Sequence, residues 1–160
     1  MTAILDRTLA ATHLLSAAAW FGALGYRLFV VNPRAMKLLG GGPPFEQFAL
    51  HLADGMRRVV LAALLTCGLT GFALAGLRWN LSADWLRLLA GKIGLWAIAL
   101  AGFAYVSWVY WPRRVFATAD EWTGVRRQGV LISLAMLGVA GLGLVLGQLC
   151  AAVRAPACWM

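Results

Sequence analysis

Charged residues are scarce in this chain of 160 residues, at 12%, and acidic residues are the scarcest, with six Asp and Glu against 14 Lys and Arg. Soluble domains usually carry about 25% charged residues, so this composition excludes an ordinary soluble domain. No carboxylate falls within the long apolar segments, which argues against proton-pump chemistry. The apolar segments also lack a two-residue alternation, which excludes the strands of a membrane barrel.

Metal-ligand motifs are equally sparse, because the chain has two histidines, three cysteines and no Cys-x-x-Cys or paired-His motif. Met136 is the only clearly intramembrane methionine, so there is no ladder of soft copper ligands. Cys150 and Cys158 could form a disulfide at an outward face or remain two thiols. Cys67 stands alone in its segment, and we expect it to be a small buried packing residue.

Long hydrophobic runs dominate what is present, with 62% of residues hydrophobic. Four stretches meet the requirement of roughly 20 mostly apolar residues for a membrane-crossing helix. They cover about residues 8–31, 59–77, 86–111 and 130–153. We predict an all-α integral membrane protein, a single domain over 1–160 folded as a four-helix transmembrane bundle. The first run is longer than the roughly 7–15 residues of a signal-peptide core, so we expect it to remain as a helix.

The connections between these spans are expected to differ. Asn32-Pro33 should end the first helix, because proline disrupts the helix and restricts the residue before it. Gly40 to Pro44 should form a flexible break, which makes the first connection a long loop. Phe45 to Met56 should form a helix that leads into the second span and could lie along the membrane surface. The third connection should begin at Pro112, and the sequence shows no convincing internal repeat.

Basic residues lie unevenly around the four spans. Nine lie at or between the ends of spans one and two or of spans three and four: Arg27, Arg34, Lys37, Arg57, Arg58, Arg113, Arg114, Arg126 and Arg127. Four lie on the opposite side: Arg7, Arg78, Arg87 and Arg154. Because positively charged loops stay in the cytoplasm, we predict cytoplasmic first and third loops and outward termini. The basic charge therefore indicates topology and contact with anionic lipids rather than with nucleic acid.

His13 and Lys92 stand out as polar residues within apolar spans. They lie about five and six residues inside the outward ends of their segments, which at 1.5 Å per residue places both roughly 7–9 Å deep. A charge inside a span is costly and is usually functional. Two basic side chains at one depth would repel unless a haem, a copper ion or an anionic lipid or substrate lay between them. Trp20 lies on the same helix face as His13.

Each of these residues also has a simpler interpretation. His13 could be a neutral histidine bonded to a backbone carbonyl or to a Ser or Thr of a neighbouring helix, and Lys92 could reach the interface along its long stem. His51 lies on the inward side, too far away to share a site with His13, and should be solvated or interfacial, with an inner cofactor site as the alternative. Gly68 and Gly71 could permit close helix packing or make room for a flat ligand such as a porphyrin.

Three stretches resemble one known family. The run His13-Leu-Leu-Ser-Ala-Ala-Ala-Trp20-Phe-Gly22 and the later Asn32-Pro33 resemble the first core helix of the copper-resistance protein D (CopD) membrane domain. Arg57-Arg58 leading to Thr70-Gly71 resembles its second helix, and Leu88-Leu-Ala-Gly-Lys92 its third. The layout is also similar to HemJ-type protoporphyrinogen oxidases, small four-helix membrane proteins that bind haem b. Their first-helix His and third-helix Lys match His13 and Lys92.

This resemblance implies a multi-pass protein of the bacterial inner membrane that binds haem b or copper near the outer leaflet. Its role would be copper homeostasis or redox chemistry, with a HemJ-like oxidase or a non-catalytic subunit of a larger complex as alternatives. The implied cofactor-binding residues are His13, Lys92, Trp20, Gly68 and Gly71, with His13 as the metal or axial haem ligand. Lys92 would be the opposite haem ligand, once deprotonated, or a partner for a propionate. Expected partners are membrane lipids and a periplasmic copper-binding protein or other membrane subunits.

Overall fold

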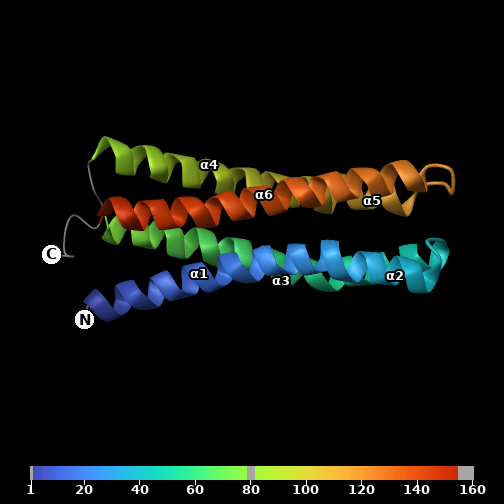
Figure 1. Ribbon diagram of the computed structural model, residues 1–160, viewed down its shortest axis with the longest axis horizontal. Helices are drawn as coiled ribbons and strands as arrows, with labels where there is room; N and C mark the ends of the chain where they lie inside the picture. Colours follow the sequence, from blue (N-terminus) through green and yellow to red (C-terminus); the bar gives the residue numbers. More distant parts are fainter. Residues whose placement is uncertain (1, 79–81, 155–160) are drawn as a thin grey trace.

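The structure, a computed structural model, describes residues 2–78 and 82–154. Helices account for nearly all of them, and no strand occurs in these two ranges (Figure 1). Four helical rods are long and apolar enough to cross a membrane: Ala3–Leu39, Pro43–Leu77, Ala83–Val115 and Trp122–Ala152. The predicted all-α, four-helix transmembrane bundle is confirmed, and the chain is a multi-pass membrane protein.

Eight helical segments make up the four rods: α1 (Thr2–Tyr26), η1 (Arg27–Val31), α2 (Asn32–Leu39), α3 (Pro43–Leu77), α4 (Ala83–Tyr105), η2 (Val106–Tyr110), α5 (Trp111–Val115) and α6 (Trp122–Arg154). The start of α1 and the end of α6 lie at the same end of the bundle, which we call the terminal end (Figure 1). The opposite end holds the turns at residues 40–42 and 116–121, and we call it the loop end.

Two prolines lie inside rods rather than at their ends. Proline normally clashes with the carbonyl group four residues before it. Here Pro33 and Pro112 follow the π-helical turns η1 and η2, where the N–H of Asn32 donates to the Arg27 carbonyl and that of Trp111 to the Val106 carbonyl. A π-turn is wider than an α-turn and gives the proline ring room beside the preceding carbonyls. The predictions that Asn32-Pro33 ends the first helix and that Pro112 begins a loop are therefore wrong.

The first connection is a tight turn. Gly40 and Gly41 adopt φ values of 72° and 68°, a left-handed conformation that costs glycine little because it has no Cβ. Pro43 begins α3 directly, at a position where the missing proline N–H would have had no helical partner. Phe45 to Met56 belongs to the continuous helix α3 and is not a separate surface helix. The expected long first loop is therefore also wrong.

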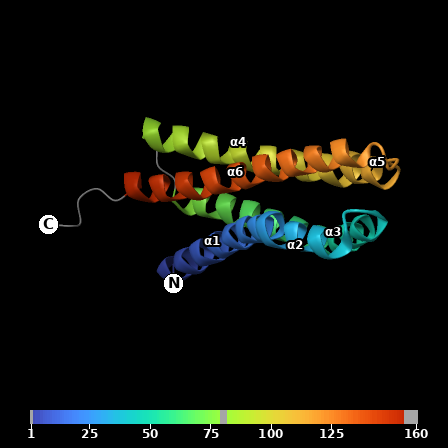
Figure 2. The same cartoon turned by 45° about the vertical axis from the view of Figure 1, so that its right-hand side comes forward.

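The rods form two pairs. α1 packs against α3 and α4 packs against α6, and between the pairs α1 contacts α6 more extensively than α3 contacts α4 (Figures 1 and 2). Many large apolar side chains lie exposed on the outside of the pairs, among them Leu15, Leu69, Ile98 and Leu142. Apolar side chains of this kind can face lipid tails. In that environment helices are stable because all their backbone polar groups are hydrogen-bonded internally.

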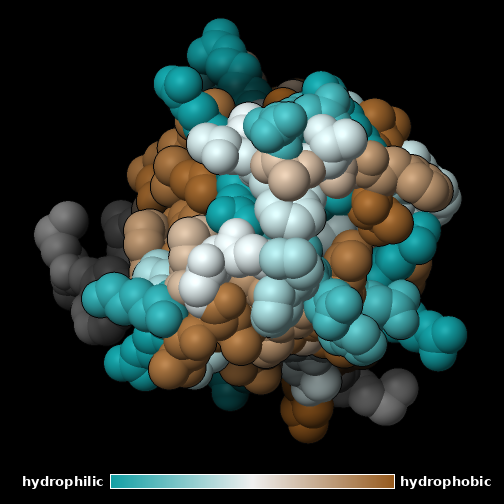
Figure 3. Space-filling model, turned by 90° about the vertical axis from the view of Figure 1, so that its right-hand side faces the viewer, coloured by the Kyte–Doolittle hydropathy of each residue, from teal (hydrophilic) through white to brown (hydrophobic). Residues whose placement is uncertain are grey.

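A buried ionic cluster joins three segments at the loop end. The Glu46 carboxylate, whose side chain is 10% exposed, accepts a 2.7 Å hydrogen bond from Arg114 Nε and another from Arg126 Nε. Arg126 also donates to the Gly41 carbonyl, which ties the first turn to α6. The Phe45 ring lies within cation–π distance of both guanidinium groups. Figure 3 views the molecule onto this end, where hydrophilic side chains spread over much of the surface.

The two halves of the chain repeat the same element order. Each half has a long helix, a π-turn, a short helix and a long return helix. In both short helices the second and third residues are Pro and Arg. The π-turns begin at Arg27 and Val106, and the return helices begin at Pro43 and Trp122. The two π-turns are therefore as far apart in the sequence as the two return helices. The expectation that the chain has no internal repeat is thus corrected.

The contacts between helices follow the same correspondence. If α1 corresponds to α4 and α3 to α6, the contact of α1 with α6 corresponds to the contact of α4 with α3, and both exist. α1 and α4 run in the same direction (Figure 1). Together with the matching contacts, this indicates that an approximate twofold axis along the bundle relates the two halves. A parallel repeat of this kind occurs in other membrane proteins, with the axis along the membrane normal.

Candidate functional site

A cavity of about 320 Å³ lies between the helix pairs in the terminal half. The five residues that the sequence singled out all line it: His13, Trp20, Gly68, Gly71 and Lys92. Its volume lies at the lower end of the range for small-molecule pockets, roughly 300–1,000 Å³. The structure therefore brings the predicted site residues to one cavity, while their cofactor role stays a prediction.

His13 is held by α3 through one ring nitrogen. Its Nδ1 lies 2.9 Å from the Cys67 carbonyl oxygen and 3.2 Å from Thr70 Oγ1. Because a carbonyl can only accept, Nδ1 carries the proton, and in a neutral imidazole the lone pair then resides on Nε2. No hydrogen bond among the described residues uses Nε2. The interpretation of His13 as hydrogen-bonded to a neighbouring helix is thus confirmed for Nδ1. This bond fixes the tautomer and the ring orientation, so the lone pair of Nε2 is available to a ligand.

Thr70 is a supporting residue to which the sequence assigned no role. Its hydroxyl donates to the Thr66 carbonyl at 2.6 Å, so its oxygen remains free to accept from His13 Nδ1. Cys67 lines the cavity and is only part-buried, and its Sγ lies 3.7 Å from Nδ1. Its carbonyl, rather than its thiol, orients the imidazole. A Thr three residues after a Cys is a weak signal, and only the packing of α1 on α3 reveals it.

The two predicted glycines make space for side chains of other helices. A Cβ at Gly68 would lie 2.5 Å from Trp96 Cζ2, and a Cβ at Gly71 would lie 3.1 Å from His13 Cε1. The Trp96 indole is fixed because Nε1 donates to the Leu64 carbonyl at 3.0 Å. Both glycines therefore let ring side chains form the cavity wall, which is the packing interpretation.

Gly68→Ala should destabilise the protein by about 1–3 kcal/mol, because the Trp96 indole must move and strain the wall. Thermal unfolding in detergent measures this change. Gly138→Ala is the matched control, since a Cβ there meets nothing within 4 Å and the position is interior to α6. Alanine should stabilise that helix by about 0.5–1 kcal/mol. Equal melting temperatures for the two variants would contradict the close contact.

Lys92 is the unpaired cation of the cavity. It is part-buried and forms no ion pair within residues 2–78 and 82–154. Its Nζ lies close to Gly147 of α6, where a Cβ would be in ordinary van der Waals contact with it at 3.5 Å. The other cavity cation, Arg78, makes two 2.6 Å hydrogen bonds to the Asp6 carboxylate. These bonds raise the pKa of the Arg78 guanidinium and balance its charge. The cavity thus offers one imidazole lone pair and one unbalanced positive charge.

The internal repeat relates His13 to Lys92, because their separation in sequence equals that of the two π-turns. The agreement extends to the other four residues of α1 in the lining. Ala10, Leu14, Ala17 and Trp20 correspond to Leu89, Ile93, Trp96 and Ala99 of α4, and all eight line the cavity. The cavity therefore lies on the approximate twofold axis. A ligand bound there would meet His13 from one half and Lys92 from the other half.

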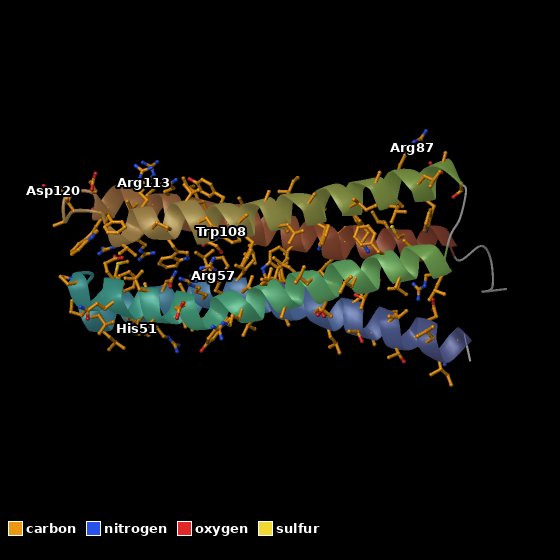
Figure 4. The ribbon with its side chains drawn as sticks, turned by 180° about the vertical axis from the view of Figure 1, so that it is seen from behind. His51, Arg57, Arg87, Trp108, Arg113 and Asp120 are labelled. Carbon is orange, nitrogen blue, oxygen red and sulfur yellow. The ribbon has the colours of Figure 1, made fainter. Side chains whose placement is uncertain are left out.

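His51 lies apart from this site. It is exposed on the outer face of α3, with Nδ1 2.9 Å from the carbonyl of Gln47 one turn earlier (Figure 4). Residues 2–78 and 82–154 contain no group of three His, Cys, Asp or Glu side chains that could hold a metal. The prediction that His51 cannot share a site with His13 is confirmed, because His51 does not line the cavity, while its contact with solvent or the membrane interface stays a prediction.

Cys150 is part-buried and also lines the cavity. Its proposed disulfide partner, Cys158, lies outside the described residues, so the disulfide stays a prediction.

No family model, no curated protein and no solved structure matches this chain. The resemblance to CopD and HemJ-type proteins therefore stays a prediction that rests on short motifs around His13 and Lys92.

Proposed function

We propose that the protein binds haem b in the His13–Lys92 cavity and serves as a CopD-like redox protein of the bacterial inner membrane. The observation that carries this proposal is the free Nε2 of His13 in a largely apolar cavity that also holds an unpaired lysine. Haem combines a flat apolar ring, an iron that binds imidazole and anionic propionates. When bound, its iron would supply one-electron chemistry.

The available donor atoms favour haem over a copper ion. A porphyrin provides four of the iron ligands itself, so the protein needs to supply only one or two. A copper ion takes its ligands from several His, Cys or Met side chains. The cavity lining offers two sulfurs, those of Cys67 and Cys150. The Cys67 sulfur lies beside Nδ1, the nitrogen already engaged with the backbone, and the described residues contain no group of three His, Cys, Asp or Glu side chains that could hold a metal ion. Copper binding and transport remain the alternative that the CopD resemblance suggests.

Lys92 supports the same proposal from the opposite half. A neutral lysine on that side could be the second iron ligand, whereas a charged one would bind a propionate. Protonated Lys92 without an anion would leave a positive charge in a mostly apolar cavity, which is costly. Either role gives a reason for a lysine at the position that corresponds to His13.

The charge distribution supports an orientation for the site. Nine basic residues lie towards the loop end, which we propose to be cytoplasmic, because positively charged loops are retained there. The His13–Lys92 cavity would then lie in the outer-leaflet half. A periplasmic copper-binding protein or another membrane subunit could approach it from that side.

The absorption spectrum of the purified protein, with haem extraction and metal analysis on the same sample, tests this proposal. We expect a Soret band and about one haem b per chain, as a single cavity with one imidazole implies. Copper without porphyrin would support the transporter alternative. Protein that contains neither, even after incubation with haemin and with copper, would contradict the proposal and leave the structural-subunit alternative.

A further inference from the structure

A second cavity, of about 250 Å³, lies between the helix pairs in the loop half. Trp20, Leu64 and Ala99 line both cavities and so form the layer between them. Two basic residues line the second cavity, the part-buried Arg27 of η1 and the exposed Arg57 of α3. Neither residue belongs to the His13–Lys92 cavity, so this is a separate site.

The two arginines lack a carboxylate partner. The ion pairs within residues 2–78 and 82–154 involve Asp6, Asp84 and Glu46, and none includes Arg27 or Arg57. Each guanidinium instead lies near an indole, Arg27 at 5.5 Å from the Trp111 ring and Arg57 at 5.1 Å from the Trp108 ring. Figure 4 shows Arg57 and Trp108 facing each other from the two helix pairs. A cation–π contact attracts the cation but leaves its charge unbalanced.

Nearby carboxylates do not remove this positive charge. Asp54 is the only acidic residue in the lining, and it is exposed and takes part in none of the ion pairs of the described residues, with Arg57 one turn later or with any other cation. Glu46 is already shared between two other arginines, Arg114 and Arg126. The cavity therefore has a net positive charge that an anionic ligand would balance.

The internal repeat shows that the opposite wall is apolar. Arg27 corresponds to Val106 and Arg57 to Met136, at the same separation in sequence, and all four line the cavity. The first half thus supplies two cations at positions where the second half supplies aliphatic side chains. Ser107 is the polar exception on the second side, and it is buried. This arrangement suits a ligand with an anionic head and an apolar chain.

We propose that the second cavity binds an anionic phospholipid, with the phosphate between Arg27 and Arg57 and an acyl chain against Val106 and Met136. Guanidinium groups bind phosphate oxygens in pairs of parallel hydrogen bonds, and basic pockets between transmembrane helices bind anionic headgroups. The cavity lies in the half that carries most of the basic residues. This proposal does not depend on haem binding in the other cavity.

Lipid titration in detergent tests this site, with native mass spectrometry as the measurement of bound lipid. The wild-type protein should retain phosphatidylglycerol at least about tenfold better than the Arg27→Gln/Arg57→Gln variant, because two cation–phosphate contacts are lost. Arg113→Gln/Arg127→Gln is the matched control, since it removes the same charge from exposed positions at the same end. It should retain phosphatidylglycerol as the wild type does.

Further measurements distinguish a lipid phosphate from a free phosphate, and a single variant replaces the double variant if the latter does not fold. Phosphatidylcholine should bind weakly, and inorganic phosphate at about 10 mM should not displace phosphatidylglycerol. Displacement by inorganic phosphate would overturn the lipid assignment in favour of a free anion. Equal retention by the wild type and the Arg27→Gln/Arg57→Gln variant would overturn the site. If that variant does not fold, Arg57→Gln alone gives the test, because Arg57 is exposed, so its replacement should not disturb folding, and its loss should still weaken binding.

Discussion

His13→Ala protein should lose most of its Soret absorbance, with haem per chain reduced about tenfold or more. Removing even a residue that supports a metal ligand typically costs 10–100-fold in affinity, so removal of the ligand should cost at least as much. His13 carries the only imidazole in the cavity, because the other histidine, His51, lies exposed on the outer face of α3. The measurement is the Soret absorbance relative to protein concentration, before and after addition of haemin.

His51→Ala is the matched control for this prediction and should keep the full Soret band. A His13→Ala protein that also keeps it would exclude His13 as the axial ligand. Lys92→Gln then separates the two roles of the lysine. If Lys92 binds iron, its loss should change the haem spectrum from low-spin to high-spin. If it binds a propionate, the spectrum should stay the same and only the affinity for haem should fall.

Glu46→Gln should lower the free energy of unfolding by up to about 3–5 kcal/mol, because it leaves two part-buried guanidinium groups without their shared negative charge. Both Arg114 and Arg126 lie 2.7 Å from the carboxylate, and the Glu46 side chain is only 10% exposed. Unfolding in a mixed-detergent titration measures the loss. Because Glu46 lies at the loop end, the haem spectrum of the folded fraction should not change.

Asp84→Asn provides the comparison. Its ion pair with Arg87 has side chains 75% and 78% exposed, and such surface pairs contribute roughly 0–1 kcal/mol. Similar losses for Glu46→Gln and Asp84→Asn would show that the buried cluster does not hold the loop end together.

The sequence predicts the spans and the site for clear physical reasons. The bilayer sets a minimum length for an apolar helix, so all four rods are visible in the hydropathy. Helix rise converts position into depth, and this places His13 and Lys92 at one level before any contact is known. That both also line one cavity depends on how the helices pack, and the structure shows it.

The course of the chain at the loop end could not be predicted in the same way. Proline is a local signal for a helix end, but a π-turn before Pro33 and Pro112 lets both rods continue. Whether a helix accommodates proline depends on hydrogen bonds and packing beyond the local sequence. The orienting role of Thr70 was likewise hidden, because it requires the packing of α1 on α3.

The internal repeat is hard to detect in the sequence because equivalent residues differ in chemical type. Histidine corresponds to lysine at His13 and Lys92, and arginine corresponds to methionine at Arg57 and Met136. Identity between the halves is therefore low at the very positions that line the cavities. The longest shared run around the π-turns is only two residues, Pro33-Arg34 in the first half and Pro112-Arg113 at the equivalent place in the second.

The twofold relation of the halves also bears on how a ligand is oriented. A site on a true symmetry axis would accept an unsymmetrical ligand in two equally stable orientations, half of the molecules holding it one way and half the other. Here the two walls of each cavity differ, with imidazole facing lysine in one and arginines facing aliphatic side chains in the other. This difference between the walls removes the degeneracy, so a ligand in either cavity should have one preferred pose and any chemistry across the bundle should have a direction.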